Sequence, residues 1–573
     1  MSTAKRLAKY LLVYKTRFIE ALLCMVMSGI LTTVLMYLLK ETIDKALTAK
    51  NIWILLLIVA SIPMLFFIRG IFTYLQNYLM YSIGQKVAAD LREQMYSRLH
   101  MLSLDYYYKT SQGKIIAYLT NDVNTLQINI NDVPLILVRD GLTIVFLLIY
   151  IFYLHWKFAL ISLIIFPLAS VLLINFAKKM RLSGRKAQNL MARLYKYIQD
   201  VINGILVVKS FVQEEREIKR FTSLNRDFYA TVMRFQRIEA MSIPIVEFAG
   251  SLVLAFLLFY GGKDVIDNVW TTGAFFSFFG AMLSMYHPLR SFAGLNARVQ
   301  QMLSAAERVF SVIDEKPTIC EVEDPEELTG FNESIIYNSV WFCYERDRYV
   351  LKNINLKINK GDRVAFVGPS GSGKTTLLLL LLRFFDPTKG EILIDNKNIK
   401  YLRLSSLRRK IGIVPQETVL FNDTVRNNIC YGNMYADEES VIAAAKLANA
   451  HTFISKLPQG YNTIIGERGV SLSVGEQQRI MLARVFLLDQ PILIFDEATS
   501  ALDAESEELI RNAIFGLPRD KTILIIAHRL STILNADYII AIENGEIIGI
   551  GTHQELMNTN PLYKRFYELQ CLL

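Results

Sequence analysis

The residues best suited to chemistry are two glycines separated by four residues and followed by lysine and threonine. They form the run Gly368-Pro369-Ser370-Gly371-Ser372-Gly373-Lys374-Thr375, which fits the P-loop pattern. Small residues let backbone N–H groups close around phosphate oxygens, and the start of a following helix adds positive potential. Lys374 can reach the terminal phosphates, and the Thr375 hydroxyl can bind Mg²⁺. The run therefore predicts a site for a nucleoside triphosphate.

The segments on either side of this run support that interpretation. The apolar residues 364–367 predict a strand, and the leucine-rich residues 376–382 predict a helix that begins at Thr376. A phosphate-binding loop needs a strand before it and a helix start after it. The alternative is a glycine- and serine-rich turn before an ordinary core helix, without a ligand.

Two carboxylates form the next candidate pair, about 120 residues downstream. The apolar residues 492–495 predict a buried strand that ends in Asp496 and Glu497. Asp496 could hold Mg²⁺, directly or through water, and Glu497 could polarise the attacking water. An apolar run ending in Asp-Glu is common, but together with the P-loop it indicates hydrolysis of the triphosphate.

Two further positions are ambiguous by themselves. The run Leu472-Ser473-Val474-Gly475-Glu476 opens a predicted helix, so it could present N–H groups to an anion or simply cap the helix. His528 follows a predicted strand at 522–527, where a lone histidine is commonly structural.

Composition indicates a membrane domain joined to a soluble one. The 573 residues exceed what a single core needs, and the chain is 52% hydrophobic yet 20% charged. The net charge of +9 is explained by basic cytoplasmic loops, so no nucleic-acid partner is predicted. Five scattered cysteines without a CxxC motif, and six dispersed histidines, imply neither a disulfide framework nor a zinc site.

Six apolar runs approach the length of about 20 residues that spans a bilayer. They lie at 18–39, 52–76, 134–154, 158–178, 243–262 and 273–295. The links after the second and fourth runs are long and rich in Lys and Arg, which places both links and both termini in the cytoplasm. The alternative is six buried helices of a large soluble core.

These patterns divide the chain into four parts. Residues 1–17 predict an amphipathic helix on the cytoplasmic membrane surface, and 18–303 a six-helix transmembrane domain with long cytoplasmic extensions. An acidic, proline-containing linker at 304–330 leads to an α/β nucleotide-binding domain with a mainly parallel sheet at 331–573. Each long link contains a segment, 104–113 and about 210–215, that either contacts something below the membrane or forms an ordinary solvated turn.

Taken in order, the motifs resemble those of ATP-binding cassette (ABC) transporters. GPSGSGKT, Gln416 in VPQE, LSVGEQQR, ILIFDE, SALD and His528 follow the family's order and approximate spacing. A membrane domain that precedes its nucleotide-binding domain is similar to the half-transporters of the MsbA-type lipid A and multidrug exporter family. The resemblance implies a type IV exporter fold in the inner (plasma) membrane, with the nucleotide-binding domain in the cytoplasm and the two link segments as coupling helices.

The resemblance also implies roles for individual residues. Tyr344 would stack on adenine, and Lys374 would neutralise the β- and γ-phosphates. Three residues would bind Mg²⁺: Thr375, Gln416 and Asp496. Glu497 would be the general base, and His528 would contact the γ-phosphate. Ser473 and Gly475 would cap the γ-phosphate of ATP on an opposite subunit. A second half-transporter is therefore required, either a second copy of this chain or a different one.

The signature run departs from the family's usual LSGGQ at two positions. Val474 replaces the first glycine, so its backbone must adopt an ordinary φ. Glu476 replaces glutamine and adds negative charge near an expected anion.

Four charged residues in or near the predicted spans suggest the cargo: Arg69, Arg139, Glu247 and Arg290. Such charges usually face a cavity or a partner. Three cations would suit a phosphorylated amphiphile, and they resemble the basic residues that bind the glucosamine phosphates in lipid A exporters. The alternative is that they reach the membrane interface or pair with Asp140 and Glu247. We therefore predict an ATP-driven exporter or flippase of a lipid A-like glycolipid; the alternatives are a drug or peptide exporter and an ATP-gated channel or regulator.

Overall fold

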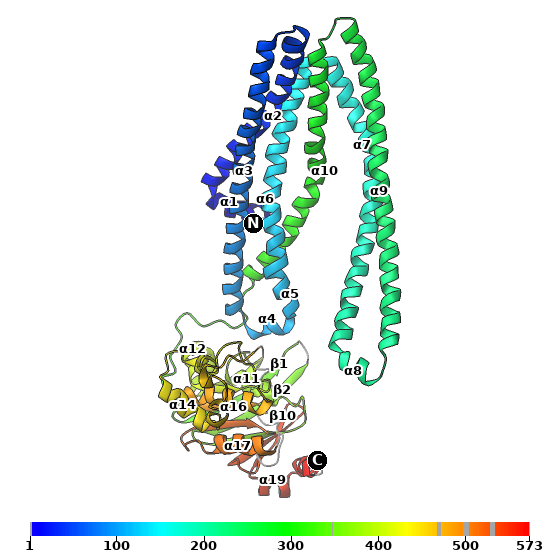
Figure 1. The fold of residues 1–573 in the computed structure, drawn as a ribbon. Helices are drawn as coiled ribbons and strands as arrows, with labels where there is room; N and C mark the ends of the chain where they lie inside the picture. Colours follow the sequence, from blue (N-terminus) through cyan, green and yellow to red (C-terminus); the bar gives the residue numbers. More distant parts are fainter. Residues whose placement is uncertain (1–2, 346–347, 467–471, 497–503, 528–532, 572–573) are drawn as a thin grey trace. The chain divides into compact units, whose positions relative to one another are not determined.

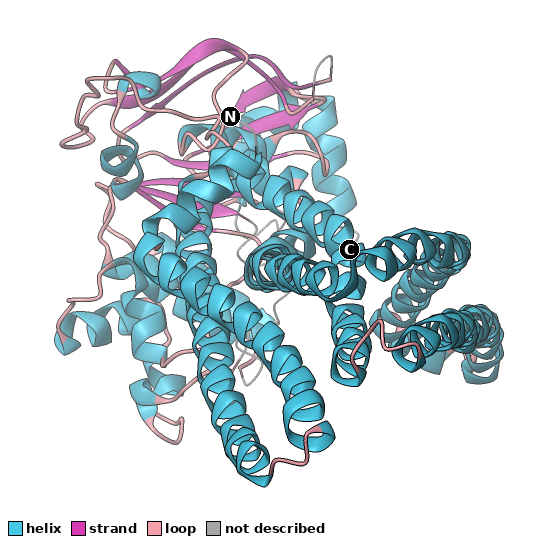
Figure 2. Ribbon diagram, turned by 90° about the horizontal axis from the view of Figure 1, so that it is seen from above, coloured by secondary structure: helices cyan, strands magenta, loops and turns pink. Residues whose placement is uncertain are grey.

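The computed structural model describes residues 3–345, 348–466, 472–496, 504–527 and 533–571 (Figure 1). These residues form two units. One consists of residues 1–99 and 115–314 and is called the helical unit; the other consists of residues 100–114 and 315–573 and is called the α/β unit. Figure 2 shows the strands in magenta and the helices in cyan.

The helical unit is built from helices that range from 5 to 63 residues in length. They are α1 (Thr3–Val13), α2 (Lys15–Glu41) with η1 (Thr42–Thr48), α3 (Ile52–Met101), α5 (Gln112–Ala117), η2 (Tyr118–Asp122), α6 (Val123–Pro134), η3 (Leu135–Asp140), α7 (Gly141–Asn203), α8 (Ile205–Ser210), α9 (Glu214–Ile266) and α10 (Thr272–Asp314). The 50 residues of α3 measure about 75 Å at 1.5 Å per residue. Because the hydrocarbon core of a bilayer is about 30 Å thick, such a helix extends well into water, as the long links predict.

All six predicted apolar runs fall within these helices. Three stretches of described residues, Lys15–Thr48, Ile52–Met101 and Gln112–Ile161, are long and apolar enough to cross a membrane. Side chains 162–181 lie outside the description, and most of the fourth run falls there. The fifth and sixth runs lie in α9 and α10.

The short link between the third and fourth runs is a break in the helix at His155. Its φ of −163° and ψ of 97° interrupt α7 and divide it into two helical segments. His155 and Phe158 contact Trp270, which lies between α9 and α10, with ring centroids 4.9 and 5.4 Å from the indole. The break thus falls within residues 155–157, which separate the third and fourth predicted runs.

Ion pairs and aromatic contacts join the helices beyond the apolar runs. Arg308 of α10 donates two hydrogen bonds, of 2.8 and 2.7 Å, to the carboxylate of Asp122 in η2. Arg6 of α1 bonds Asp314 at the end of α10 and lies 4.1 Å from the ring centroid of Phe310. The amphipathic N-terminal helix is therefore attached to α10.

The α/β unit contains two sheets. The first has the order β2-β1-β4-β5 and is antiparallel: β1 (Ser334–Cys343), β2 (Tyr349–Asn359), β4 (Lys389–Ile394) and β5 (Lys397–Asn398). The second has the order β10-β9-β3-β8-β7-β6: β3 (Arg363–Val367), β6 (Ile411–Val414), β7 (Ile492–Asp496), β8 (Thr522–Ile526), β9 (Tyr538–Glu543) and β10 (Glu546–Gly551). Among the described strands of this sheet, β10 alone is antiparallel to its neighbour, which confirms the predicted, mainly parallel sheet.

Helices cover the second sheet and complete its core. They are α11 (Lys374–Leu381), α12 (Leu404–Arg409), α13 (Val425–Ile429), α14 (Glu438–Leu447), α15 (His451–Ile454), α16 (Val474–Leu487), α17 (Ala504–Phe515), α19 (His553–Thr559) and α20 (Pro561–Cys571), with short 3-10 turns η4 (Ile399–Tyr401), η5 (Cys430–Gly432) and η6 (Gly460–Asn462). Every residue of β3, β7 and β8 is buried. The carboxyl ends of the parallel strands share one edge, where the P-loop follows β3, Gln416 follows β6 and Asp496 ends β7.

The two segments predicted to turn within the long links differ in their surroundings. The first forms α4 (Leu104–Lys109) and belongs to the α/β unit, where the Ser103 hydroxyl accepts a 3.0 Å hydrogen bond from the Ile319 N–H. The second is the turn between α8 and α9 in the helical unit, with Val212 at a φ of +52°. Phe211 and Val212 are 71% and 79% exposed there, so the tip of this turn is apolar. The first segment is therefore a contact region within the α/β unit and not an ordinary solvated turn.

Candidate nucleotide-binding site

The P-loop leaves the buried strand β3 and closes tightly on its neighbours. Gly368 has a φ of +155°, and a Cβ at this position would lie 2.0 Å from the Ile542 carbonyl oxygen. Gly373 has a φ of +103°, and its Cβ would lie 2.6 Å from Leu351 Cδ2. Both conformations are rare for side-chain-bearing residues. Glycine is therefore required at the first and last glycine positions of the motif.

Lys374 begins α11 and is held over the loop that precedes it. Its side chain is only 5% exposed, and Nζ donates hydrogen bonds of 2.8 and 2.9 Å to the carbonyl oxygens of Gly368 and Pro369. An ammonium group in this position places a positive charge inside the curve of the loop. Phosphate oxygens bound by the loop would thus meet both N–H groups and a cation.

The residues predicted to serve Mg²⁺ fit that ion in type and position. The Thr375 hydroxyl donates a 3.4 Å hydrogen bond to the Asp496 carboxylate, which is buried at the end of β7. Thr375 and Gln416 line the same pocket. All three side chains offer oxygen, the ligand that Mg²⁺ prefers. Glu497 and His528 lie outside the described residues.

One pocket of about 320 Å³ gathers most of the predicted nucleotide contacts. It is lined by Tyr344, Val350, Ser370, Gly371, Gly373, Lys374, Thr375, Thr376 and Gln416. Ser372 is buried beside it, and Pro369 bonds Lys374. The structure thus brings together residues that are separated by up to 72 positions, as the motif order suggests.

Tyr344 forms the aromatic side of this pocket. It follows β1, is 41% exposed, and shares a 3.1 Å hydrogen bond with the Thr376 hydroxyl. Its ring meets Phe342 and Phe385 edge to face, at centroid distances of 4.8 and 5.2 Å. Burial raises the pKa of the Tyr344 phenol, and the Thr376 hydrogen bond opposes that shift. The ring is fixed from behind and open on the pocket side.

The signature run begins α16 with a capping box. Ser473 is the N-cap; its hydroxyl accepts from the Glu476 N–H at 3.3 Å, and the Glu476 carboxylate accepts from the Ser473 N–H at 2.8 Å. Val474 is the first helical residue, so its φ is ordinary, as its side chain requires. Gly475 is buried and Ser473 is exposed. None of the described residues that line the nucleotide pocket comes from α16.

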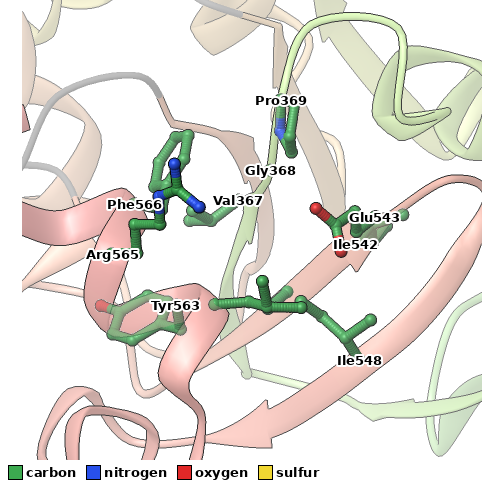
Figure 3. Close-up of a pocket in the computed structure, with 11 residues that line it drawn as sticks. Val367, Gly368, Pro369, Ile542, Glu543, Ile548, Tyr563, Arg565 and Phe566 are labelled. Carbon is green, nitrogen blue, oxygen red and sulfur yellow. The ribbon is translucent and has the colours of Figure 1, made fainter. Parts of the chain in front are cut away.

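A second pocket, of about 210 Å³, lies where β3 enters the P-loop (Figure 3). Val367, Gly368 and Pro369 form one wall, the hairpin β9–β10 another, and α20 a third. Apart from Glu543 and Arg565, which the figure shows on opposite sides, its labelled lining is mainly apolar. Sequence patterns gave no sign that the C-terminal helix α20 packs beside the P-loop, because only the fold brings residues 367 and 563 together.

The charged residues predicted for the cargo lie in different surroundings within the helical unit. Arg69 lines a pocket of about 410 Å³ between α2, α3 and α10. Arg139 contacts the adjacent Asp140 through Nε and a terminal nitrogen, each 2.7 Å from a carboxylate oxygen. The positive charge of Arg139 is also near enough to repel that of Arg69. Arg290 is exposed on α10 and is not among the described residues that line this pocket. The Glu247 side chain lies outside the description.

The fold and the site define a P-loop ATP-binding domain fused to a membrane-spanning helical domain. Comparison with protein families gives a match to the ABC transporter transmembrane region over residues 18–289 and to the ABC transporter domain over 351–500. The chain belongs to the ABC transporter family. It is an exporter-type half-transporter, in which ATP hydrolysis is coupled to translocation across a membrane.

Its relatives match over nearly their full length. The chain is 42% identical to an ATP-dependent lipid A-core flippase of Syntrophus aciditrophicus, over 100% of this chain and 95% of that protein. It is 35% identical to the ATP-dependent lipid A-core flippase of Haemophilus influenzae strain 86-028NP, over 100% and 97%. A solved structure of a bacterial Atm1-family ABC exporter with ATP bound is similar at a TM-score of 0.79 and 29% identity, covering 97% of this chain and 98% of that one.

Proposed function

We propose that this protein moves a phosphorylated, lipid A-like glycolipid out of the cytoplasmic leaflet of the inner membrane. Two copies of the chain form the transporter, and both termini and the α/β unit lie in the cytoplasm. The names of the relatives support the cargo class. The observation that carries the proposal is the position of Arg69 in a pocket of the helical unit.

The lining of this pocket suits an anionic head group next to apolar chains. Thr32, Thr42 and Ser284 contribute hydroxyls, while Leu35 and Phe66 are among its apolar lining residues. Within the described part of the chain, no carboxylate forms an ion pair with Arg69. A cation in a membrane-spanning region is costly unless it is compensated. A phosphate group could accept paired hydrogen bonds from the guanidinium and supply that compensation.

At the nucleotide site, the proposed roles follow the geometry described above. Tyr344 would contact adenine, Lys374 the phosphates, and Thr375, Gln416 and Asp496 would hold Mg²⁺, which would neutralise phosphate charge as the terminal bond breaks. Glu497 would act as general base and His528 would contact the γ-phosphate. Because the start of α16 does not line the pocket of its own chain, Ser473 and Gly475 are proposed to complete the site of a partner chain, with Glu476 beside them.

The cargo proposal is tested by charge removal in nanodiscs. We expect bis-phosphorylated lipid A to stimulate ATP hydrolysis by the wild-type protein, and dephosphorylated lipid A to stimulate it less. Arg69→Gln should raise the lipid concentration needed for half-maximal stimulation by roughly 10- to 100-fold, since hydrogen bonds to charged groups contribute about 1.5–3 kcal/mol. Arg216→Gln is the matched control, because it removes the same charge from an exposed position of α9 that lies outside the predicted spans.

The outcomes separate the alternatives. Equal stimulation of wild type and Arg69→Gln would remove Arg69 from cargo binding. Equal stimulation by phosphorylated lipid, dephosphorylated lipid and uncharged amphipathic drugs would favour a drug exporter. Native mass spectrometry of the purified protein weighs the assembly and any bound lipid. A protein mass other than twice that of the chain, once bound lipid is released, would refute the homodimer.

A further inference from the structure

A chain of three aromatic rings joins α4 to the nucleotide pocket within the α/β unit. Tyr108, near the end of α4, stacks on Phe385 with ring centroids 6.1 Å apart and an interplanar angle of 21°. Phe385 meets Tyr344 edge to face, at 5.2 Å and 87°. The ring on α4 is therefore connected, through a single intermediate side chain, to the ring that lines the adenine side of the pocket.

The intermediate ring is tightly enclosed. Phe385 is 7% exposed, and Phe342 contacts both Phe385 and Tyr344, at 5.6 and 4.8 Å. Side chains in such close-packed surroundings cannot shift far without moving their neighbours. A displacement of Tyr344 would therefore be passed to Phe385 and on to Tyr108.

Tyr344 is the ring that can respond to a nucleotide. It is partly exposed and lines the pocket, whereas its hydroxyl is bonded to Thr376 of α11 at 3.1 Å. Thr376 follows Lys374 and Thr375 in sequence, so this hydrogen bond also ties the aromatic side of the pocket to the phosphate side. Stacking of a base on Tyr344 would restrict the ring in the position that contacts Phe385.

We propose that Phe385 is a positioning residue that couples nucleotide binding at Tyr344 to the placement of α4 through Tyr108. The inference rests on the proposed stacking of adenine on Tyr344. Because α4 begins three residues after the end of α3, its placement reaches the helical unit through the chain itself. Binding free energies are reciprocal, so loss of the Tyr108 contact must weaken ATP binding although Tyr108 does not line the pocket.

The experiment measures the equilibrium dissociation constant of ATP for the full-length protein in nanodiscs, without added lipid substrate. Tyr108→Leu removes the ring from a side chain that is 66% exposed, so the fold should be retained. We expect a roughly two- to tenfold rise in the dissociation constant, the range that one aromatic pair allows. Tyr108→Phe keeps the aromatic ring, so this variant should bind ATP with wild-type affinity. Lys109→Gln, which removes only an exposed ion pair with Asp105 on the same helix, should leave the affinity unchanged.

A double-mutant cycle identifies the route. In a Tyr344→Leu background, Tyr108→Leu should have no further effect, because the ring chain is already interrupted. If Tyr344→Leu weakens ATP binding but Tyr108→Leu does not, the coupling is refuted while the adenine role stands. If Tyr344→Leu has no effect on ATP binding, the adenine role itself fails. Equal effects of Tyr108→Leu in both backgrounds would also overturn the route through Tyr344.

Discussion

Replacement of Glu476 by glutamine tests how the start of α16 takes part in phosphate binding. The Ser473 hydroxyl donates a 2.9 Å hydrogen bond to the Glu476 carboxylate. A serine hydroxyl has one proton to donate. In this structure the Ser473 hydroxyl donates that proton to a hydrogen bond with Glu476, so the proposed phosphate of a partner chain's ATP would compete for it with a carboxylate that also repels the phosphate.

The expected magnitude follows from the charge. Two like charges about 4 Å apart repel by about 1 kcal/mol in water, which corresponds to about fivefold in a binding constant. Glutamine can form the same capping box, so the start of α16 and the thermal stability should be retained. We expect Glu476→Gln to lower the KM for ATP about fivefold. The inhibition constant of ADP should not change, because ADP lacks the terminal phosphate.

The assay is ATP hydrolysis in nanodiscs over a range of ATP concentrations, with ADP inhibition measured in parallel. The matched control is Glu555→Gln, which alters the capping box that Thr552 and Glu555 form at the start of α19. Ser473→Ala should raise the KM. If Ser473→Ala raises the KM and Glu476→Gln leaves it unchanged, the repulsion argument is refuted. If Glu476→Gln and Glu555→Gln lower the KM for ATP equally, the cause is a general effect of removing negative charge and not repulsion at the start of α16.

Two further predictions concern the packing of the helical unit and the catalytic step. A Cβ at Gly84 of α3 would lie 2.0 Å from the Asn131 side-chain oxygen, so Gly84→Ala should destabilise the protein by about 1–3 kcal/mol, seen as a lower midpoint of thermal unfolding. Adding Asn131→Ala should recover most of this loss of stability, since the Asn131 side-chain oxygen is buried without a hydrogen-bond partner among the described residues. A double variant no more stable than Gly84→Ala alone would contradict a clash between the new Cβ and Asn131. Glu497→Gln should bind ATP but hydrolyse it at least about 100-fold more slowly, because general-base catalysis contributes about 10²–10⁴ in rate. Wild-type turnover in that variant would exclude Glu497 as the base.

Local patterns were sufficient to predict the fold class. The P-loop, Gln416 and Asp496 each follow an apolar run, and parallel strands bring such positions to one edge of a sheet. The break at His155 was predictable because a polar residue there separates two apolar runs. These features depend on residues that are close in sequence or on a rule of sheet topology, so no long-range packing had to be known.

Contacts between distant segments were not predictable in the same way. The sequence suggested that 104–113 touches something below the membrane, but not that Tyr108 stacks on Phe385, because ring contacts leave no periodic signal. The bond between Ser473 and Glu476 was within reach of sequence reasoning, since Ser-x-x-Glu is the capping-box pattern.

The arginines show how the structure sharpens the cargo argument. From the sequence, Arg69 and Arg139 are equally good candidates for cargo binding, because both are cations in apolar surroundings. In the structure Asp140 is bound to Arg139, so this pair adds no net charge, whereas Arg69 faces a pocket that also presents hydroxyls. Among the described residues that line this pocket, Arg69 is therefore the one cation, and no described carboxylate pairs with it. A homodimer would supply a second Arg69 by symmetry, and a cargo with two separate phosphate groups would match two such cations better than a singly charged amphiphile would.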